Sequence, residues 1–124
     1  MKFRAARHTN NLQAIADFYI NLLGLKLLGE FKNHEGYHGV FIGLPGDAWH
    51  LEFTISADVP LHQPDNDDLL VFYPDTEKEK DGILERLKQA GVTVVIAKNP
   101  YWNNNGHTFL DPDGFRIVIA AGVI

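Results

Sequence analysis

The spacing of hydrophobic residues predicts a helix near the start of the chain. Hydrophobic side chains recur at helical spacing at Leu12, Ile15, Phe18, Tyr19, Leu22 and Leu23. Asn10 and Asn11 offer a helix N-cap before this segment, and Gly24 stands where a residue with left-handed backbone ends many helices. We therefore expect an amphipathic helix over Leu12 to Leu23, preceded by a short strand over Lys2 to Arg7.

Three strands are predicted after this helix, because runs of hydrophobic residues are separated by turn-forming sequences. The turn at Asn33 to Gly36 and the sequence Pro45-Gly46-Asp47 divide them. The predicted strands are Leu25 to Phe31, Tyr37 to Leu44 and Trp49 to Ile55. The first half of the chain thus has the order β-α-β-β-β.

A segment rich in Asp, Pro and Asn, from Ser56 to Asp67, predicts a linker, after which the pattern of the first half returns. A strand is expected over Leu69 to Tyr73. A helix should begin near Asp75 or Thr76, where Thr76 and Glu79 have capping-box spacing, although Gly82 weakens it by about 1 kcal/mol relative to Ala.

Gly91 should end this second helix as Gly24 ends the first. Placing Gly24 over Gly91 aligns the sequence Leu25-Lys26-Leu27-Leu28 with Val92-Thr93-Val94-Val95, which indicates an internal duplication. The remaining predicted strands are Thr93 to Ala97, Gly106 to Leu110 and Phe115 to Ala120. The last two are joined by Asp111-Pro112-Asp113-Gly114, a sequence typical of a tight hairpin.

Composition limits the classes of function. A chain of 124 residues, 45% hydrophobic and 22% charged, is typical of one folded domain. We divide it into module one at about 1–56, a linker at about 57–67 and module two at about 68–124. The net charge of -5 argues against nucleic-acid and membrane partners, and the lack of cysteine excludes thiolate chemistry. No sequence typical of a signal peptide or membrane span is seen, so we expect a cytoplasmic protein.

Two motifs resemble the vicinal oxygen chelate superfamily, which includes glyoxalase I, extradiol dioxygenases and bleomycin-resistance proteins. One is Asn11-Leu12-Gln13-Ala14-Ile15-Ala16-Asp17-Phe18-Tyr19 with Leu23-Gly24-Leu25, and the other is Asp111-Pro112-Asp113-Gly114-Phe115. The resemblance runs from about Lys2 to Ile119. It implies an α+β fold of two tandem βαβββ modules that form a curled, cup-shaped mixed sheet, often with two chains paired as a homodimer.

The resemblance also implies where a metal would bind. Metal-dependent relatives place four ligands on the first and last strands of each half, and these positions fall on Arg4, Glu52, Leu69 and Val118. Glu52 alone has a side chain that suits a divalent ion, since Arg4 only donates and the other two are aliphatic. A shift of one residue would offer Asp68 instead of Leu69. We therefore expect a degenerate metal site and no cofactor.

The same mapping predicts that Arg4 and Glu52 are neighbours, so that a guanidinium replaces the metal as counter-charge. Arg4 would then either grip an anionic ligand or form a structural ion pair. His50 shares a strand face with Glu52, and with His107 these residues offer an alternative site for a metal or for proton transfer.

Further candidate ligand-binding residues lie in the second half. Asn99 to Gly106 is a polar segment that we expect to be a loop, and its adjacent aromatic residues Tyr101 and Trp102 would line a pocket. Arg116 shares a strand face with Val118 and would bring a second cation to the ligand. Packing over the sheet edge for the aromatic residues and solvent exposure for Arg116 are the alternatives.

The leading functional hypothesis is a metal-independent small-molecule-binding protein that resembles bleomycin-resistance proteins and holds an aromatic or weakly polar ligand. Arg4, His50, Glu52, Tyr101, Trp102 and Arg116 are the predicted ligand-binding residues. An alternative is a glyoxalase-like lyase or isomerase with a rearranged metal site and Glu52 as the catalytic base. A non-catalytic interaction module is the third hypothesis.

Overall fold

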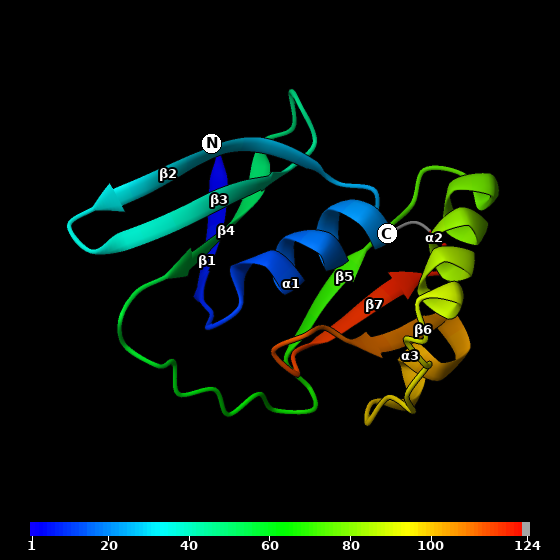
Figure 1. Cartoon of the computed structure of the whole chain (residues 1–124). Coiled ribbons are helices and arrows are strands. Elements are labelled where there is room, and N and C mark those ends of the chain that lie inside the picture. The colour runs from blue at the N-terminus through cyan, green and yellow to red at the C-terminus, as the bar shows by residue number, and fades with distance from the viewer. Residues whose placement is uncertain (123–124) are drawn as a thin grey trace. The chain divides into compact units, whose positions relative to one another are not determined.

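The structure is a computed structural model that describes residues 1–122. The chain forms two compact units, Met1–His62 and a second unit from Gln63 onward. Each unit contains one sheet and its own helices (Figure 1). The α+β class predicted from the sequence is confirmed.

The first unit is built on a four-stranded sheet in the order β1-β4-β3-β2. Its strands are β1 (Phe3–His8), β2 (Lys26–His34), β3 (Tyr37–Gly43) and β4 (Trp49–Ile55). β1 pairs with β4 in parallel, whereas β4 with β3 and β3 with β2 are antiparallel. The predicted β-α-β-β-β order is confirmed in this unit.

The helix of the first unit begins as predicted but changes its hydrogen bonding halfway. The side chain of Asn11 accepts from the N–H of Ala14 at 3.0 Å and caps α1 (Leu12–Ala16). A π-helical segment, η1 (Asp17–Leu22), follows, and the N–H of Leu23 bonds the carbonyl of Phe18, five residues back. Apolar residues three and four apart suit both helix types, so the sequence pattern did not distinguish them.

This helix covers one face of the first sheet (Figure 1). Tyr19 from η1 and Phe53 from β4 are almost completely buried, and their rings stack with centroids 5.0 Å apart. Because successive strand residues point to opposite faces, residues of β4 that alternate with Phe53 lie on the face away from the helix. His50 and Glu52 are two of these.

The second unit has a three-stranded sheet in the order β5-β7-β6. Its elements are β5 (Leu69–Phe72), α2 (Glu77–Gln89), β6 (Gly106–Leu110) and β7 (Arg116–Ala120). Thr76 caps α2 as predicted, since its side chain accepts from the N–H of Glu79 at 3.1 Å. Gly91 after α2 and Gly24 after η1 both have positive φ, of 78° and 82°, as their expected role at helix ends requires.

The predicted strand over Thr93 to Ala97 is wrong, because the segment forms only an isolated bridge between Val95 and Thr108. Side chains take the backbone groups that a strand would have paired. Asn103 accepts from the N–H of Ala97 at 2.8 Å and donates to its carbonyl at 3.1 Å. Arg116 donates from Nη1 to the carbonyl of Ile96 at 3.0 Å. These side-chain bonds take the place of ladder bonds at Ile96 and Ala97.

The predicted loop over Asn99 to Gly106 is also wrong, since Pro100–Asn105 forms a short helix, α3. Its N-cap is Asn99, whose side chain accepts from the N–H of Tyr101 at 3.1 Å. Pro100 occupies the first helical turn, where its fixed φ suits a helix and its missing N–H costs no bond. The Asn-Pro pair was a local helix-start signal that the loop prediction overlooked.

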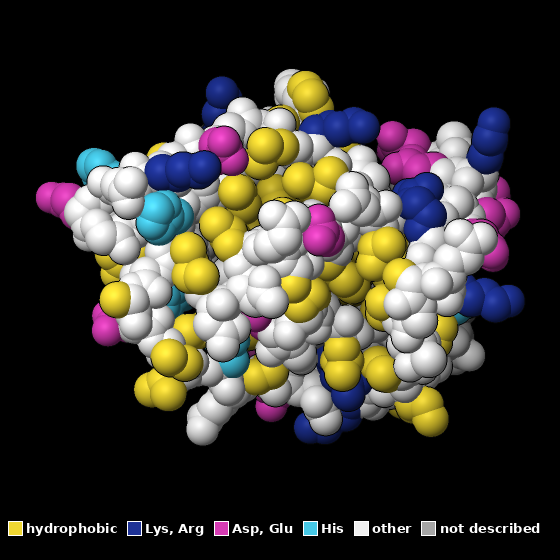
Figure 2. Space-filling view, in the orientation of Figure 1, with side chains coloured by type: hydrophobic (Ala, Val, Ile, Leu, Met, Phe, Trp, Pro, Cys, Tyr) yellow, Lys and Arg dark blue, Asp and Glu magenta, His cyan; other side chains and the backbone are white. Residues whose placement is uncertain are grey.

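Two surface properties bear on possible partners. Within the described residues, no helix is both long enough and apolar enough to cross a membrane. On the face shown in Figure 2, basic side chains are scattered among acidic, polar and hydrophobic ones. The basic side chains on that face are therefore not gathered into a single phosphate-binding patch.

Candidate functional site

Three of the predicted ligand-binding residues come together on the first sheet. In the parallel register of β1 and β4, Arg4 lies opposite His50, and Glu52 lies two residues further along β4. All three occupy the sheet face away from α1 and η1. Phe41 of β3 pairs with Glu52 and joins the same face. We call Arg4, Phe41, His50 and Glu52 the Arg4 cluster.

The guanidinium of Arg4 contacts every other member of the Arg4 cluster. Its Nε donates to Nε2 of His50 at 2.9 Å, and its Nη1 lies 3.7 Å from Oε2 of Glu52. Its Cζ stands 4.7 Å from the ring centroid of Phe41, a cation–π distance. A single cation thus holds an imidazole, a carboxylate and an aromatic ring together.

Hydrogen-bond chemistry assigns the tautomer of His50. A guanidinium can only donate, so Nε2 of His50 must present its lone pair to Arg4. A neutral His50 therefore carries its proton on Nδ1. The lone pair of His50 that could bind a metal is occupied by Arg4.

The Arg4 cluster is partly open to solvent. The side chain of Arg4 is 49% exposed, whereas that of Glu52 is 16% exposed. The guanidinium therefore keeps N–H donors available to an incoming molecule, while the carboxylate lies deeper. The ion pair contributes at most about 1 kcal/mol, since water around the half-exposed Arg4 screens the charges at 3.7 Å.

Aromatic side chains extend this surface beyond Phe41. The ring of Phe31, on β2, lies 5.8 Å from that of Phe41. Gly39 leaves space for the Phe31 ring, because a Cβ at position 39 would lie 2.4 Å from a carbon of that ring. The face therefore combines a cationic centre with two aromatic rings. Phe31 and Phe41 were missed from the sequence, although counting across the Pro45-Gly46-Asp47 turn would have placed Phe41 beside Glu52.

The residues present do not fit the divalent ion that the family resemblance implies. Leu69 and Val118 occupy the face of the second sheet opposite the one turned toward α2, and neither has a lone pair. Asp68 precedes β5 and is exposed. In the first unit, Arg4 places a permanent cation against Glu52. Among residues 1–122, no group of three or more His, Asp or Glu side chains is placed to hold a metal.

The three predicted ligand-binding residues of the second unit make contacts of different kinds. Tyr101 and Trp102 stack on each other in α3, with centroids 4.9 Å apart, and Tyr101 is half-exposed. Arg116 holds the carbonyl of Ile96. His107 lies on the opposite face of the sheet from Arg116, toward α2, and belongs to a different unit from His50 and Glu52.

Comparison with known proteins identifies relatives over nearly the whole chain. The N-terminal and C-terminal domain models of the YycE-like family match residues 3–54 and 67–121. The uncharacterized protein YycE of Bacillus subtilis (strain 168) is 46% identical over 120 residues, which cover 94% of this chain and 85% of that protein. A crystal structure of a YycE protein from Bacillus subtilis has a TM-score of 0.88 at 44% identity, covering 99% of this chain and 90% of that chain.

More distant structures share the fold. TnmS3, an antibiotic binding protein from Streptomyces sp. CB03234, has a TM-score of 0.67 at 24% identity, covering 97% of this chain and 93% of its own. The fosfomycin resistance protein FosX from Listeria monocytogenes, in complex with Mn(II) and 1S,2S-dihydroxypropylphosphonic acid, has a TM-score of 0.74 at 15% identity. The match covers 98% of this chain and 91% of that one. These similarities show the glyoxalase and bleomycin-resistance fold.

Proposed function

Since the chain belongs to the YycE-like family and has the fold of the vicinal oxygen chelate superfamily, we propose that it binds a small molecule without metal at the Arg4 cluster. The observation that carries the proposal is the guanidinium of Arg4, which stands against Glu52 where relatives use a cation. It supplies positive charge and donors, and Phe31 and Phe41 supply apolar contact. An aromatic or weakly polar ligand suits this combination.

The candidate binding residues are those of the sequence analysis together with the two phenylalanines. Arg4 would donate to an acceptor on the ligand. Its hydrogen bond to His50 and its ion pair with Glu52 would hold the guanidinium in position. Tyr101, Trp102 and Arg116 stay candidates for ligand contact in the second unit. The fold also occurs in TnmS3, an antibiotic binding protein, which supports small-molecule binding as a role for this architecture.

An enzymatic function is the second candidate, because Glu52 is mostly buried and shares its strand face with His50. In that case Glu52 would act as a base on an activated carbonyl compound, as in a glyoxalase-like lyase or isomerase. The ion pair with Arg4 opposes this role, since the carboxylate already faces a permanent cation at 3.7 Å. We further propose a homodimer, which the family resemblance implies, and a cytoplasmic location, as expected from the sequence.

Thermal unfolding of metal-stripped protein distinguishes these functions. We expect no rise of the midpoint with Ni, Zn, Mn, Fe or Co ions, and a rise with at least one member of a panel of bleomycin, other aromatic antibiotics and aromatic glutathione adducts, because a ligand of the native state stabilises it. The organic ligand's effect should shrink in Arg4→Met. A midpoint raised by a metal in wild type but not in Glu52→Ala would overturn the metal-free proposal and favour the enzyme.

The coupling within the Arg4 cluster is measured by a double-mutant cycle. Arg4→Met leaves the mostly buried carboxylate of Glu52 without its cation, and we expect it to lower the free energy of unfolding by about 1 kcal/mol. Adding Glu52→Gln should restore part of this loss. Urea unfolding of both single variants and the double variant gives the coupling energy, with Lys32→Met as an exposed control. If both single variants unfold like wild type, the pairing has no energetic role.

A further inference from the structure

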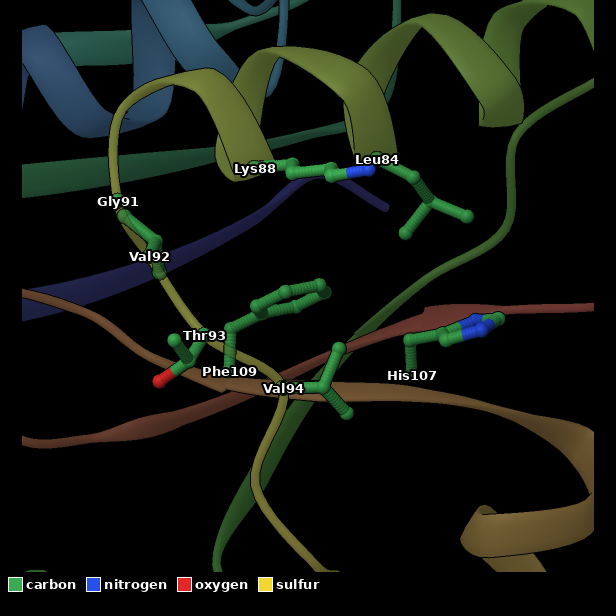
Figure 3. Close-up of a pocket in the computed structure, with 8 residues that line it drawn as sticks. All are labelled: Leu84, Lys88, Gly91, Val92, Thr93, Val94, His107 and Phe109. Atoms are coloured by element: carbon green, nitrogen blue, oxygen red, sulfur yellow. The ribbon is translucent and has the colours of Figure 1, made fainter.

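A hollow lies in the second unit, between α2 and β6 (Figure 3). Leu84 and Lys88 reach it from α2, and His107 and Phe109 reach it from β6. The segment from Gly91 to Val94 closes one side. Its volume of about 370 Å³ falls within the range of about 300–1,000 Å³ typical of small-molecule pockets. We call this hollow the α2–β6 pocket.

The pocket exists because the segment after α2 does not pair as a strand. In the first unit, the corresponding nine-residue strand β2 pairs six of its residues with β3. In the second unit, Val95 alone bridges to Thr108, so residues 91–94 stand away from β6. Asn103 and Arg116 hold the next two residues, Ala97 and Ile96, and keep the segment in this position. The pocket is thus a consequence of specific contacts.

Most of the wall is apolar, but two nitrogen-bearing side chains interrupt it. Leu84, Val92, Val94 and Phe109 supply hydrocarbon. Nδ1 of His107 is shielded from solvent and has no hydrogen-bond partner among the described residues. A ligand in the hollow cannot reach this shielded nitrogen. A ligand bond to His107 would therefore be made through Nε2–H, in the tautomer that leaves no unpaired proton on Nδ1.

The charge of the pocket points to an anionic ligand. Lys88 extends over the pocket from α2, on the side facing β6 and His107 (Figure 3). No acidic side chain is among the described residues that line it. The last carbonyls of α2 are paired, since the N–H of Val92 bonds that of Leu87 and the N–H of Gly91 bonds that of Lys88. They do not compete with an anion for the ammonium group.

We propose that the α2–β6 pocket is a second binding site, which takes a small carboxylic acid with an aromatic or branched apolar body. The carboxylate would accept from the Lys88 ammonium and from Nε2–H of His107, and the apolar body would pack on Leu84 and Val94. This site lies on the helix side of its sheet, whereas the Arg4 cluster lies on the side of the first sheet away from its helix. It is therefore independent of the function proposed above.

Titration with phenylacetate, followed by amide NMR of the full chain, tests the proposal. We expect saturable shifts of the amides of Gly91 to Val94 and of His107 to Phe109, with the amides of β1 and β4 unchanged. Phenylacetamide, which has the same shape without the charge, should bind at least about tenfold more weakly, because hydrogen bonds to charged groups are the stronger ones. Absence of saturable shifts in these two segments overturns the proposal.

Variants assign the effect to the named residues. Lys88→Met and His107→Phe should each weaken phenylacetate binding by about tenfold or more, and Val94→Trp, which fills the pocket with an indole, should abolish it. Lys78→Met on the same helix is the matched control, because this exposed lysine is not among the residues that line the pocket. A spectrum with native dispersion shows that each variant folds. Equal affinities for Lys88→Met and Lys78→Met would contradict the assignment.

Discussion

Phe53→Ala is expected to lower the free energy of unfolding by about 3–5 kcal/mol, the range found when a buried phenylalanine is truncated. Phe53 is 2% exposed, and its ring stacks on that of Tyr19, which is fully buried. Removing the ring leaves a cavity between β4 and η1. The sheet and the helix can move only partly toward each other, so the cavity does not close. Because a domain of this size is stable by about 5–15 kcal/mol, the variant loses a large share of its stability.

Urea or thermal unfolding measures this loss of stability. Two further variants serve as controls for it. Phe53→Leu keeps most of the volume and should cost about 1–1.5 kcal/mol. Phe3→Ala removes the same ring from a position that is 67% exposed, and should change stability by less than about 0.5 kcal/mol. A Phe53→Ala variant as stable as Phe3→Ala would mean that the helix does not pack on this face. The placement of His50 and Glu52 on the opposite face would then fail as well.

The elements of the fold that were predictable from the sequence are those set by local signals. Asn11 and Thr76 cap the two longer helical segments as predicted, and Gly24 and Gly91 end them with positive φ. Each signal acts within a few residues of the chain, so no knowledge of the tertiary structure was needed.

The errors lie where long-range contacts override local patterns. Thr93 to Ala97 is a run of apolar and β-branched residues typical of a strand, but Asn103 and Arg116 bond the backbone of its last two residues, Ala97 and Ile96. No pattern within the segment reveals that competition. The helix at Pro100–Asn105 is a different case, because its start signal was local and was outweighed by a composition typical of loops.

The candidate site was predictable only in part. The neighbourhood of Arg4 and Glu52 was expected from the family resemblance and agrees with the 3.7 Å contact. The hydrogen bond from Arg4 to His50 and the cation–π contact with Phe41 depend on the register of three strands, which the sequence analysis did not derive. Side-chain chemistry could be read from the sequence, whereas the contacts required the structure.

Asp111→Ala is expected to be the second most damaging substitution, with a loss of about 2–4 kcal/mol, since buried donors that lose a charged acceptor are costly. Asp111 is 4% exposed, and its Oδ1 accepts from the N–H of Asp113 at 2.9 Å and from that of Phe115 at 3.1 Å. Its own N–H bonds the carbonyl of Phe115 at 2.8 Å. One carboxylate oxygen therefore organises the whole Asp-Pro-Asp-Gly turn.

Asp111→Asn separates the hydrogen bonds from the charge, because an amide oxygen can occupy the place of Oδ1. We expect this variant to lose only about 1 kcal/mol in urea unfolding, well below the loss in Asp111→Ala. The turn leads directly into β7, whose first residue is Arg116, and Arg116 holds the carbonyl of Ile96. The Ala variant should therefore also perturb the amide NMR signals of residues 95–97. If the Ala and Asn variants were both as stable as wild type, the turn residues Pro112 and Gly114 would form the hairpin without the carboxylate.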